Sequence, residues 1–214
     1  MLRKSLNPVI YLLRRLFGQE SVMSGSDPET EYRRRHSELV EELRALKDPL
    51  AGEIAGEIER TGSLIGALLG HFREGSMFEN LPAKARFENT VLAIKAIIKG
   101  LCILQPLILV IEDIQWLDSD TRRVLGSLAR NIEGFPLLIL ATSRYEDDGS
   151  PPVLEVDDDV PVGTVALKEL ERQHAERLAE HVTGGIPDRG LADFIEARCG
   201  CNPFYIRQFC LFML

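Results

Sequence analysis

Cysteines, basic residues and long apolar runs are all scarce in this sequence. The chain has 214 residues, and its four cysteines lie in apolar or helical patterns, so we expect reduced packing residues rather than a disulfide framework. No apolar run reaches the roughly 20 residues that a membrane-spanning helix needs. Asp and Glu (33) outnumber Lys and Arg (25), giving a formal charge of -8, which argues against a surface that neutralises nucleic-acid phosphates. We therefore expect a globular, cytoplasmic protein with no direct nucleic-acid or membrane partner.

The first eighty residues carry weak structural signals. Arg14 and Arg15 interrupt the apolar part of the first twenty residues, which argues against a secretory signal. A basic amphipathic membrane helix is one interpretation of this segment, and a packed helix with Asn7 as its cap and Pro8 at its first position is the other. After a Ser, Gly, Asp and Pro-rich linker, residues 31–46 predict a largely solvated helix. A shorter apolar segment follows at residues 63–72.

The middle of the chain predicts a strand, a helix and a second strand. A long amphipathic helix is expected over residues 83–104, followed by uniformly apolar strands at 107–111 and 137–141, with a helix at about 119–132 between them. This order predicts a right-handed βαβ unit with parallel strands. Uniformly apolar strands are typical of a sheet that is covered on both faces. Residues 163–167 are a third, weaker strand candidate.

The last third of the chain predicts helices. Their expected ranges are 170–182 and 191–199, with a final helix over 204–214 that Asn202 caps and Pro203 opens. The final helix is nearly all apolar, which predicts that it docks on a partner or continues into further chain.

Two adjacent carboxylates follow the first predicted strand. The stretch LILVIEDIQWLD places Glu112 and Asp113 at the carboxyl end of that strand, where nucleotide triphosphatases present acids to a magnesium ion and an attacking water. The alternative is that the pair caps a neighbouring helix. No G-x-x-x-x-G-K-[ST] motif occurs in the sequence, so the loop that would hold the phosphates is missing from these residues.

Longer motifs make this pattern more specific. IEDIQWLDSDTRRVL followed by LLILATSRYEDD resembles the Walker B and sensor strands of AAA-type P-loop ATPases in the signal-transducing STAND group. Members of that group occur beside nucleotide cyclase, protein kinase or LuxR-type domains. An ARFENTVLAI-like helix precedes the first strand, and GCNPFYIRQF resembles the group's Gly-Asn-Pro-Phe module, with Cys201 as an additional residue. The resemblance covers most of the chain from Leu81 onward, and the first twenty residues more weakly.

The resemblance implies roles for six residues. Glu112 and Asp113 match the acid pair that holds Mg²⁺ and orients water, although the family's common order, with Glu second as the base, is reversed here. The residues that match the sensor at the tip of the next strand are Thr142, Ser143 and Arg144. Arg144 suits contact with a γ-phosphate, with a surface salt bridge as the alternative. Pro203 matches the proline that lies against adenine, although its helix-starting position would also explain it.

Several other residues suggest structural roles. Trp116 and Asp118 match the family's trailing W-x-D; we expect Trp116 to pack and Asp118 or Ser119 to cap a helix. A zinc site would need four residues whose spacing matches no usual zinc pattern. These residues are His174, His181, Cys199 and Cys201.

The sequence as a whole predicts an α/β fold: a partial parallel-sheet P-loop NTPase core with a C-terminal α-helical lid lobe. We expect an N-terminal helical segment and linker (1–80), the α/β core (81–166) and the helical lid (167–214). The expected function is that of a fragment of an ATP-binding signalling ATPase with Mg²⁺, linked to a protein partner or to fused sensor and output domains. Without its phosphate loop the chain should bind ATP weakly or not at all. The alternatives are a non-catalytic interaction module derived from a degenerate ATPase, and the regulatory region of a nucleotide cyclase.

Overall fold

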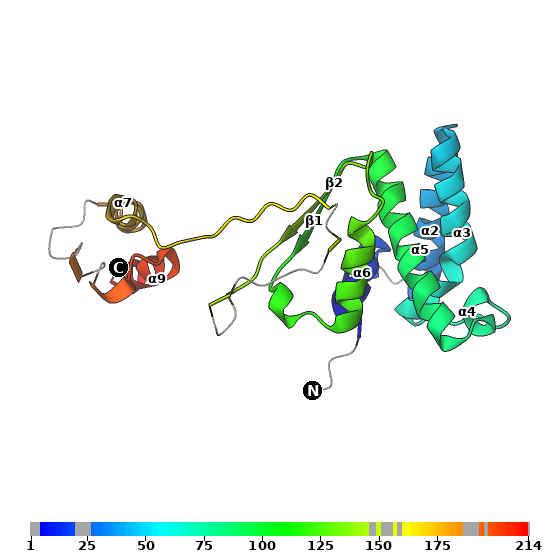
Figure 1. The fold of residues 1–214 in the computed structure, drawn as a ribbon, viewed down its shortest axis with the longest axis horizontal. Helices are drawn as coiled ribbons and strands as arrows, with labels where there is room; N and C mark the ends of the chain where they lie inside the picture. The colour runs from blue at the N-terminus through cyan, green and yellow to red at the C-terminus, as the bar shows by residue number, and fades with distance from the viewer. Residues whose placement is uncertain are drawn as a thin grey trace. The chain divides into compact units, whose positions relative to one another are not determined.

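The chain forms two compact units, and most of its ordered structure is helical (Figure 1). The computed structural model describes residues 5–19, 27–145, 149–150, 156–157, 160–185, 193–194 and 197–213. The first unit spans Met1–Pro161 and the second spans Val162–Leu214. The segment predicted at 1–80 and most of the segment predicted at 81–166 therefore lie in one unit. The only sheet among the described residues is a parallel pair of strands, so the fold is α/β but largely helical.

In the described residues, the first unit contains six α-helices, one 3-10 helix and two strands. In chain order these are α1 (Asn7–Leu16), α2 (Pro28–Ala45), α3 (Pro49–Leu69), α4 (Met77–Asn80), α5 (Ala83–Leu104), β1 (Leu107–Ile111), the 3-10 helix η2 (Ile114–Trp116), α6 (Ser119–Ala129) and β2 (Leu137–Ala141). None of the helices in the described ranges is long and apolar enough to cross a membrane.

The N-terminal helices differ from the sequence prediction. Asn7 is the first residue of α1 rather than its cap; Leu6 precedes the helix in a left-handed conformation (φ 63°). Asp27 caps α2, accepting a hydrogen bond from the Thr30 N–H (3.0 Å), and Asp48 caps α3 in the same way. The expected short apolar segment at 63–72 begins in the last third of a 21-residue helix, which ends at Leu69.

Helix α2 is largely solvated, as expected, and only one side of it is buried. Four of its side chains are buried, because α2 packs against both α3 and α5. They are Tyr32, Leu39, Val40 and Leu43. The N-terminal helices thus contribute side chains to the main hydrophobic core, and most of the predicted linker lies outside the described residues.

Glycines let α2 and α3 approach closely. A Cβ at Gly62 would lie 2.7 Å from Nε2 of His36, and one at Gly66 would lie 3.3 Å from the Tyr32 ring. The Tyr32 hydroxyl donates to the Gly62 carbonyl oxygen (2.6 Å), and the His36 Nε2 bonds the Ile58 carbonyl oxygen (3.1 Å). These polar rings can be buried at the contact because the α3 backbone provides their partners.

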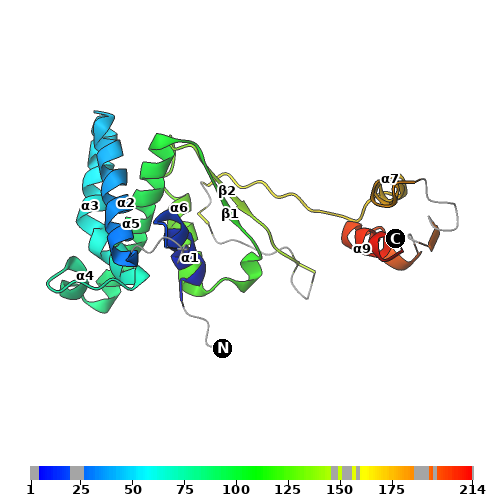
Figure 2. The ribbon, with the colours of Figure 1, turned by 180° about the vertical axis from the view of Figure 1, so that it is seen from behind.

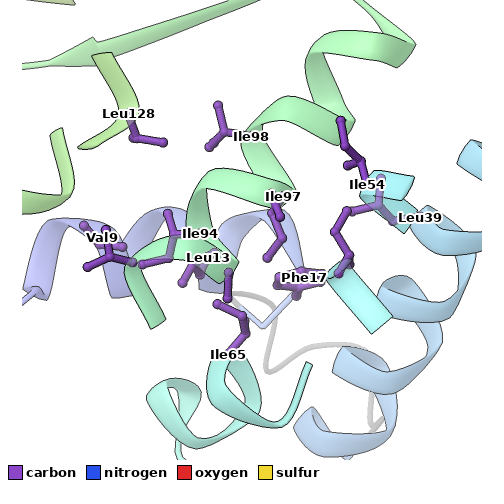
Figure 3. Packing of buried hydrophobic residues seen from close by; sticks show 14 of the residues in the cluster. Val9, Leu13, Phe17, Leu39, Ile54, Ile65, Ile94, Ile97, Ile98 and Leu128 are labelled. Carbon is purple, nitrogen blue, oxygen red and sulfur yellow. The ribbon is translucent and has the colours of Figure 1, made fainter. Parts of the chain in front are cut away.

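The core of the first unit joins helices that are far apart in sequence. Figure 3 shows side chains from α1, α2, α3, α5 and α6 converging around Ile94 and Ile97 of α5. The cluster includes Leu13 and Phe17 from the first twenty residues, both about 1% exposed. The first twenty residues therefore pack on the core as expected for a buried helix.

Helix α6 ends three residues earlier than expected. Lys95 of α5 donates to the carbonyl oxygens of Ser127 and Arg130, and Asn131 adopts a positive φ of 47°. A cation is favourable at a helix C-terminus, where free carbonyl groups face outward. These contacts end the helix at Ala129.

The strands are parallel and lie at the positions predicted from the sequence. Leu107 pairs with Leu137 and Ile111 with Ala141. One face of the sheet packs on the helical core through alternate residues, and Figures 1 and 2 show the helices gathered on that side.

The other face of the sheet is open within the described part of the chain. Its side chains are between 51% and 62% exposed: Ile108, Val110, Leu138 and Leu140. The prediction of strands that are covered on both faces is therefore wrong for this structure. Burial depends on what packs against each face, which the composition of a strand does not specify.

The second unit is a small helical cluster. Helices α7 (Arg172–Thr183) and α9 (Pro203–Met213) pack through a core of Ala175, Ala179, Cys199, Ile206 and Cys210. The side chain of Asn202 accepts from the Phe204 N–H (3.0 Å), as expected for its capping role. In the predicted helix 191–199, residues 193–194 and 197–199 are helical and the rest lie outside the described residues. Residues 163–167 form no strand.

Candidate functional site

The residues predicted to act together lie at the carboxyl ends of two adjacent parallel strands. Glu112 and Asp113 follow β1 directly, and Thr142 to Arg144 follow β2. Glu112, Asp113, Thr142 and Arg144 are exposed and Ser143 is half-buried. The parallel register places both sets of residues at one edge of the sheet, where α/β proteins bind ligands.

Main-chain and side-chain hydrogen bonds join the two strand tips. The Thr142 N–H donates to the Ile111 carbonyl oxygen (2.9 Å), and the Ile114 N–H donates to the Thr142 carbonyl oxygen (3.0 Å). The Asp113 N–H donates to the Thr142 hydroxyl oxygen (3.2 Å). Thr142 therefore holds the loop after β1 through both its backbone and its side chain.

Asp113 has an unusual backbone conformation. Its φ is 54° and ψ is 51°, in the left-handed region, which Asp tolerates better than most residues. The Asp113 carbonyl oxygen accepts from the Trp116 N–H (2.9 Å), closing the short helix η2. This turn leads from the acid pair directly into η2, whose first residue, Ile114, still bonds Thr142 at the tip of β2.

Gln115 connects the acid pair to the second strand tip. Its Nε2 donates to Oδ1 of Asp113 (3.0 Å), while its Oε1 accepts from the Ser143 hydroxyl (2.9 Å) and lies 3.4 Å from the Arg144 N–H. The Ser143 hydroxyl also lies within bonding distance of the Arg144 carbonyl oxygen (3.1 Å). Sequence reasoning missed Gln115, whose only signal was its position between the acid pair and Trp116.

Helix α6 anchors the far side of the loop. The Arg122 guanidinium donates to the Ile114 carbonyl oxygen (2.9 Å). Asp118 caps α6, as predicted, accepting from both the N–H (2.9 Å) and the hydroxyl (2.7 Å) of Thr121. Burial acts to raise the pKa of Asp118, but the hydrogen bonds from Thr121 and from the Leu6 N–H outweigh it, so the pKa lies below its ordinary value. Asp118 is thus a structural residue that also ties α1 to α6.

Trp116 does not pack as expected. Its side chain is 61% exposed on η2. A large aromatic side chain beside the polar strand tips adds an apolar surface on which a planar group can stack.

The strand tips suit a hydrated magnesium ion. Mg²⁺ keeps several waters and is usually bound through one or two carboxylates together with substrate phosphates. Glu112 and Asp113 supply two adjacent acids at an exposed edge, with the Thr142 and Ser143 hydroxyls on the neighbouring strand. Over the described ranges, no group of three or more His, Cys, Asp or Glu side chains could hold a metal ion. The edge therefore has too few protein ligands for a closed metal site.

The sixth predicted residue lies in the other unit. Pro203 begins α9 in the second unit, where Asn202 precedes it as the cap. Pro203 is itself exposed. The structure thus brings five of the six predicted residues to one edge of the first unit, and Pro203 belongs to a separate unit.

Comparison with known proteins identifies one distant relative. An uncharacterized protein of Rhizobium meliloti (strain 1021) is 30% identical over 180 residues, which cover 76% of this chain and 16% of the relative. The chain therefore spans about one sixth of the length of the relative it matches. No family model matches the sequence, and no solved structure matches the fold.

Proposed function

We propose that this chain carries the Walker B and sensor portion of an ATP-dependent signalling ATPase related to the STAND group. The observation that supports this most directly is the union of Glu112 and Asp113 with Thr142, Ser143 and Arg144 at one edge of a parallel sheet. In the complete ATPase, ATP with Mg²⁺ acts as a conformational switch and slow hydrolysis resets it.

Different residues at the strand tips would hold the metal ion, orient water and contact phosphate. Magnesium would polarise a water and screen phosphate charge. Glu112 and Asp113 would hold the hydrated ion, and Asp113 would accept a hydrogen bond from the attacking water. The Arg144 side chain, exposed at the adjacent tip, supplies positive charge for a phosphate. The hydrogen bonds of Thr142 keep the two tips together.

The second unit has apolar side chains that could contact the nucleotide base. It combines a small core with exposed aromatic side chains on α9, including Phe204 and Tyr205 next to Pro203. These rings and Pro203 supply flat apolar surfaces that suit an adenine base.

Nucleotide binding by the chain itself is predicted to be weak. The sequence has no G-x-x-x-x-G-K-[ST] motif, and the amides and lysine of that loop supply much of the affinity for the β and γ phosphates. In this proposal the chain contributes the acid pair that would hold Mg²⁺, here called the metal edge (Glu112 and Asp113), the sensor residues Thr142 to Arg144, and the exposed aromatic side chains of α9.

A ligand-observed NMR experiment tests this proposal. Saturation transfer from the chain to ATP should appear in Mg²⁺ and fall strongly in the double variant Glu112→Gln/Asp113→Asn. The matched control is Glu41→Gln/Glu42→Gln, which removes the same charge from an exposed acid pair on α2. Equal transfer in wild type and the strand-tip variant would refute nucleotide binding at this edge.

A second candidate function is a non-catalytic interaction module. It is favoured by the open apolar face of the sheet and by exposed apolar residues along α9, where Phe212 is 87% exposed. Exposed apolar patches of this kind mark protein interaction sites. In that case the Glu112→Gln/Asp113→Asn variant keeps every activity of the chain, whereas Val110→Ser/Leu138→Ser loses partner binding. A regulatory region of a nucleotide cyclase is a third candidate, supported by the resemblance alone.

A further inference from the structure

The Gln115 side chain contacts both strand tips. Its amide group spans from the Asp113 carboxylate on one side to Ser143 and Arg144 on the other. It lies half-buried in η2, which the left-handed turn at Asp113 places over the sheet edge. The residues that it joins are those proposed to contact metal and phosphate.

The chemistry of the partners fixes the orientation of this amide. The Arg144 N–H is a donor, so the group that faces it must be the Gln115 oxygen. An ionised Asp113 carboxylate only accepts hydrogen bonds, so the group that faces it must be the NH₂. In the reverse orientation both contacts would be repulsive. A carboxylate or an aliphatic side chain at position 115 could not satisfy both sides.

We propose that Gln115 is a positioning residue that holds the Asp113 carboxylate in register with the sensor residues of β2. This inference rests on the proposed function, because it assigns Gln115 a role in metal binding by the acid pair. The amide leaves Oδ2 of Asp113 and the Glu112 carboxylate to face a cation. Ser143 and Arg144 contact the same planar amide group as Asp113. A movement of Ser143 or Arg144 would therefore be passed on to the Asp113 side chain through Gln115.

Replacement of Gln115 should weaken metal binding without unfolding the chain. Side chains that orient metal ligands through hydrogen bonds typically contribute about tenfold or more to metal affinity. We therefore expect Gln115→Met, which is similar in length but makes no such bonds, to weaken Mn²⁺ binding about tenfold. Mn²⁺ alone serves as the probe, and its affinity is measured from paramagnetic broadening of the amide signals of the full chain.

A glutamine at the other end of β1 provides the control. Gln105 is exposed and lies two residues before β1, at the C-cap of α5. Gln105→Met should leave Mn²⁺ affinity unchanged, and both variants should keep the amide spectrum of the helical core.

A double-mutant cycle separates positioning from a general disturbance of the loop. Ser143→Ala removes one of the two contacts on the β2 side and should weaken Mn²⁺ binding less than Gln115→Met does, because the contact with the Arg144 N–H remains. In the Gln115→Met background the same change should have no further effect, because the connection is already broken. Independent effects of the two substitutions would overturn the proposal. Ser143→Ala also tests the connection if Gln115→Met fails to fold.

The same titrations distinguish the failure of this inference from failure of the proposed function. If Glu112→Gln/Asp113→Asn abolishes Mn²⁺ broadening but Gln115→Met binds like wild type, the positioning role is refuted and the metal edge stands. If the acid-pair variant broadens as wild type does, the metal edge is refuted, and the role of Gln115 with it.

Discussion

The helical layer and the strand tips of the first unit are held together in different ways. Helices α2, α3 and α5 meet by close packing, with Gly62 and Gly100 leaving room for side chains of neighbouring helices. The strand tips instead expose polar side chains that hydrogen bonds hold in place. A packed layer is sensitive to the loss or gain of a single methyl group. Exposed polar side chains at the strand tips can be substituted at little cost in folding stability. The residue types at these positions can therefore be determined by ligand binding.

The largest expected effect is on the packed layer. Leu43 of α2 is fully buried in the core, so Leu43→Ala should lower the free energy of unfolding by about 3 kcal/mol, from lost burial and the cavity that remains. Leu138→Ala, on the open face of the sheet, should cost less than about 1 kcal/mol. Urea unfolding followed by circular dichroism measures both. Similar costs would show that the open sheet face is covered in solution.

A glycine pair on α3 sharpens the same contrast. Gly62→Ala places a methyl group 2.7 Å from Nε2 of His36, whose ring is fixed by its bond to Ile58, and should cost about 2 kcal/mol of stability. A Cβ at Gly56 would meet no atom of a neighbouring element within 4 Å. Gly56→Ala should therefore stabilise the helix by about 0.5–1 kcal/mol. A stabilising Gly62→Ala would contradict the close approach of α2 and α3.

At the polar edge, the backbone rather than the side chain should dominate stability. Asp113→Asn keeps a residue that tolerates a left-handed backbone, whereas Asp113→Ala does not. We expect Asp113→Ala to be less stable than Asp113→Asn by about 1 kcal/mol, while both lose the carboxylate and its metal binding. The difference in melting temperature measures the first effect. Equal stabilities would argue against the left-handed turn after β1.

The smallest expected effect is a pH dependence from the packed layer. Burial lowers the pKa of His36, although its bond with the Ile58 carbonyl and the charge of Glu59 act in the opposite direction. Below the ordinary pKa of about 6.5 the unfolded chain therefore binds more protons at this site than the folded chain. The contribution of His36 to stability is present above that pH and is lost as the pH falls towards the folded pKa. His36→Gln should flatten the melting-temperature profile between about pH 7.5 and 5.5, and an unchanged slope would count against this explanation.

Much of the secondary structure could be predicted from local patterns. The bounds of α5, β1 and β2 agree with the prediction because each has strong periodicity or a uniform apolar run, and Pro106 separates α5 from β1. Helix α3 was missed over residues 49–62 because glycines at 52, 56 and 62 reduce its helix propensity. Helix α3 is stabilised instead by packing against both α2 and α5. A local sequence pattern does not show such contacts between distant segments.

The candidate site was also predicted only in part. The positions of Glu112, Asp113 and the Thr142–Arg144 segment follow from strand ends, so the sequence predicts that they meet. The role of Gln115 depends on a left-handed residue two positions earlier, which no composition rule predicts for Asp. The sequence also did not predict that Trp116 is exposed.

The most direct test of the metal edge is a map of Mn²⁺ broadening across the amide signals of the full chain. We predict broadening centred on Glu112 and Asp113 and extending to Thr142, Ser143 and Arg144, because the two strand tips are neighbours. The Glu112→Gln/Asp113→Asn variant should lose that broadening, whereas Glu41→Gln/Glu42→Gln should keep it. Broadening spread over the acidic surface, or unchanged in the strand-tip variant, would contradict a metal site at the strand tips.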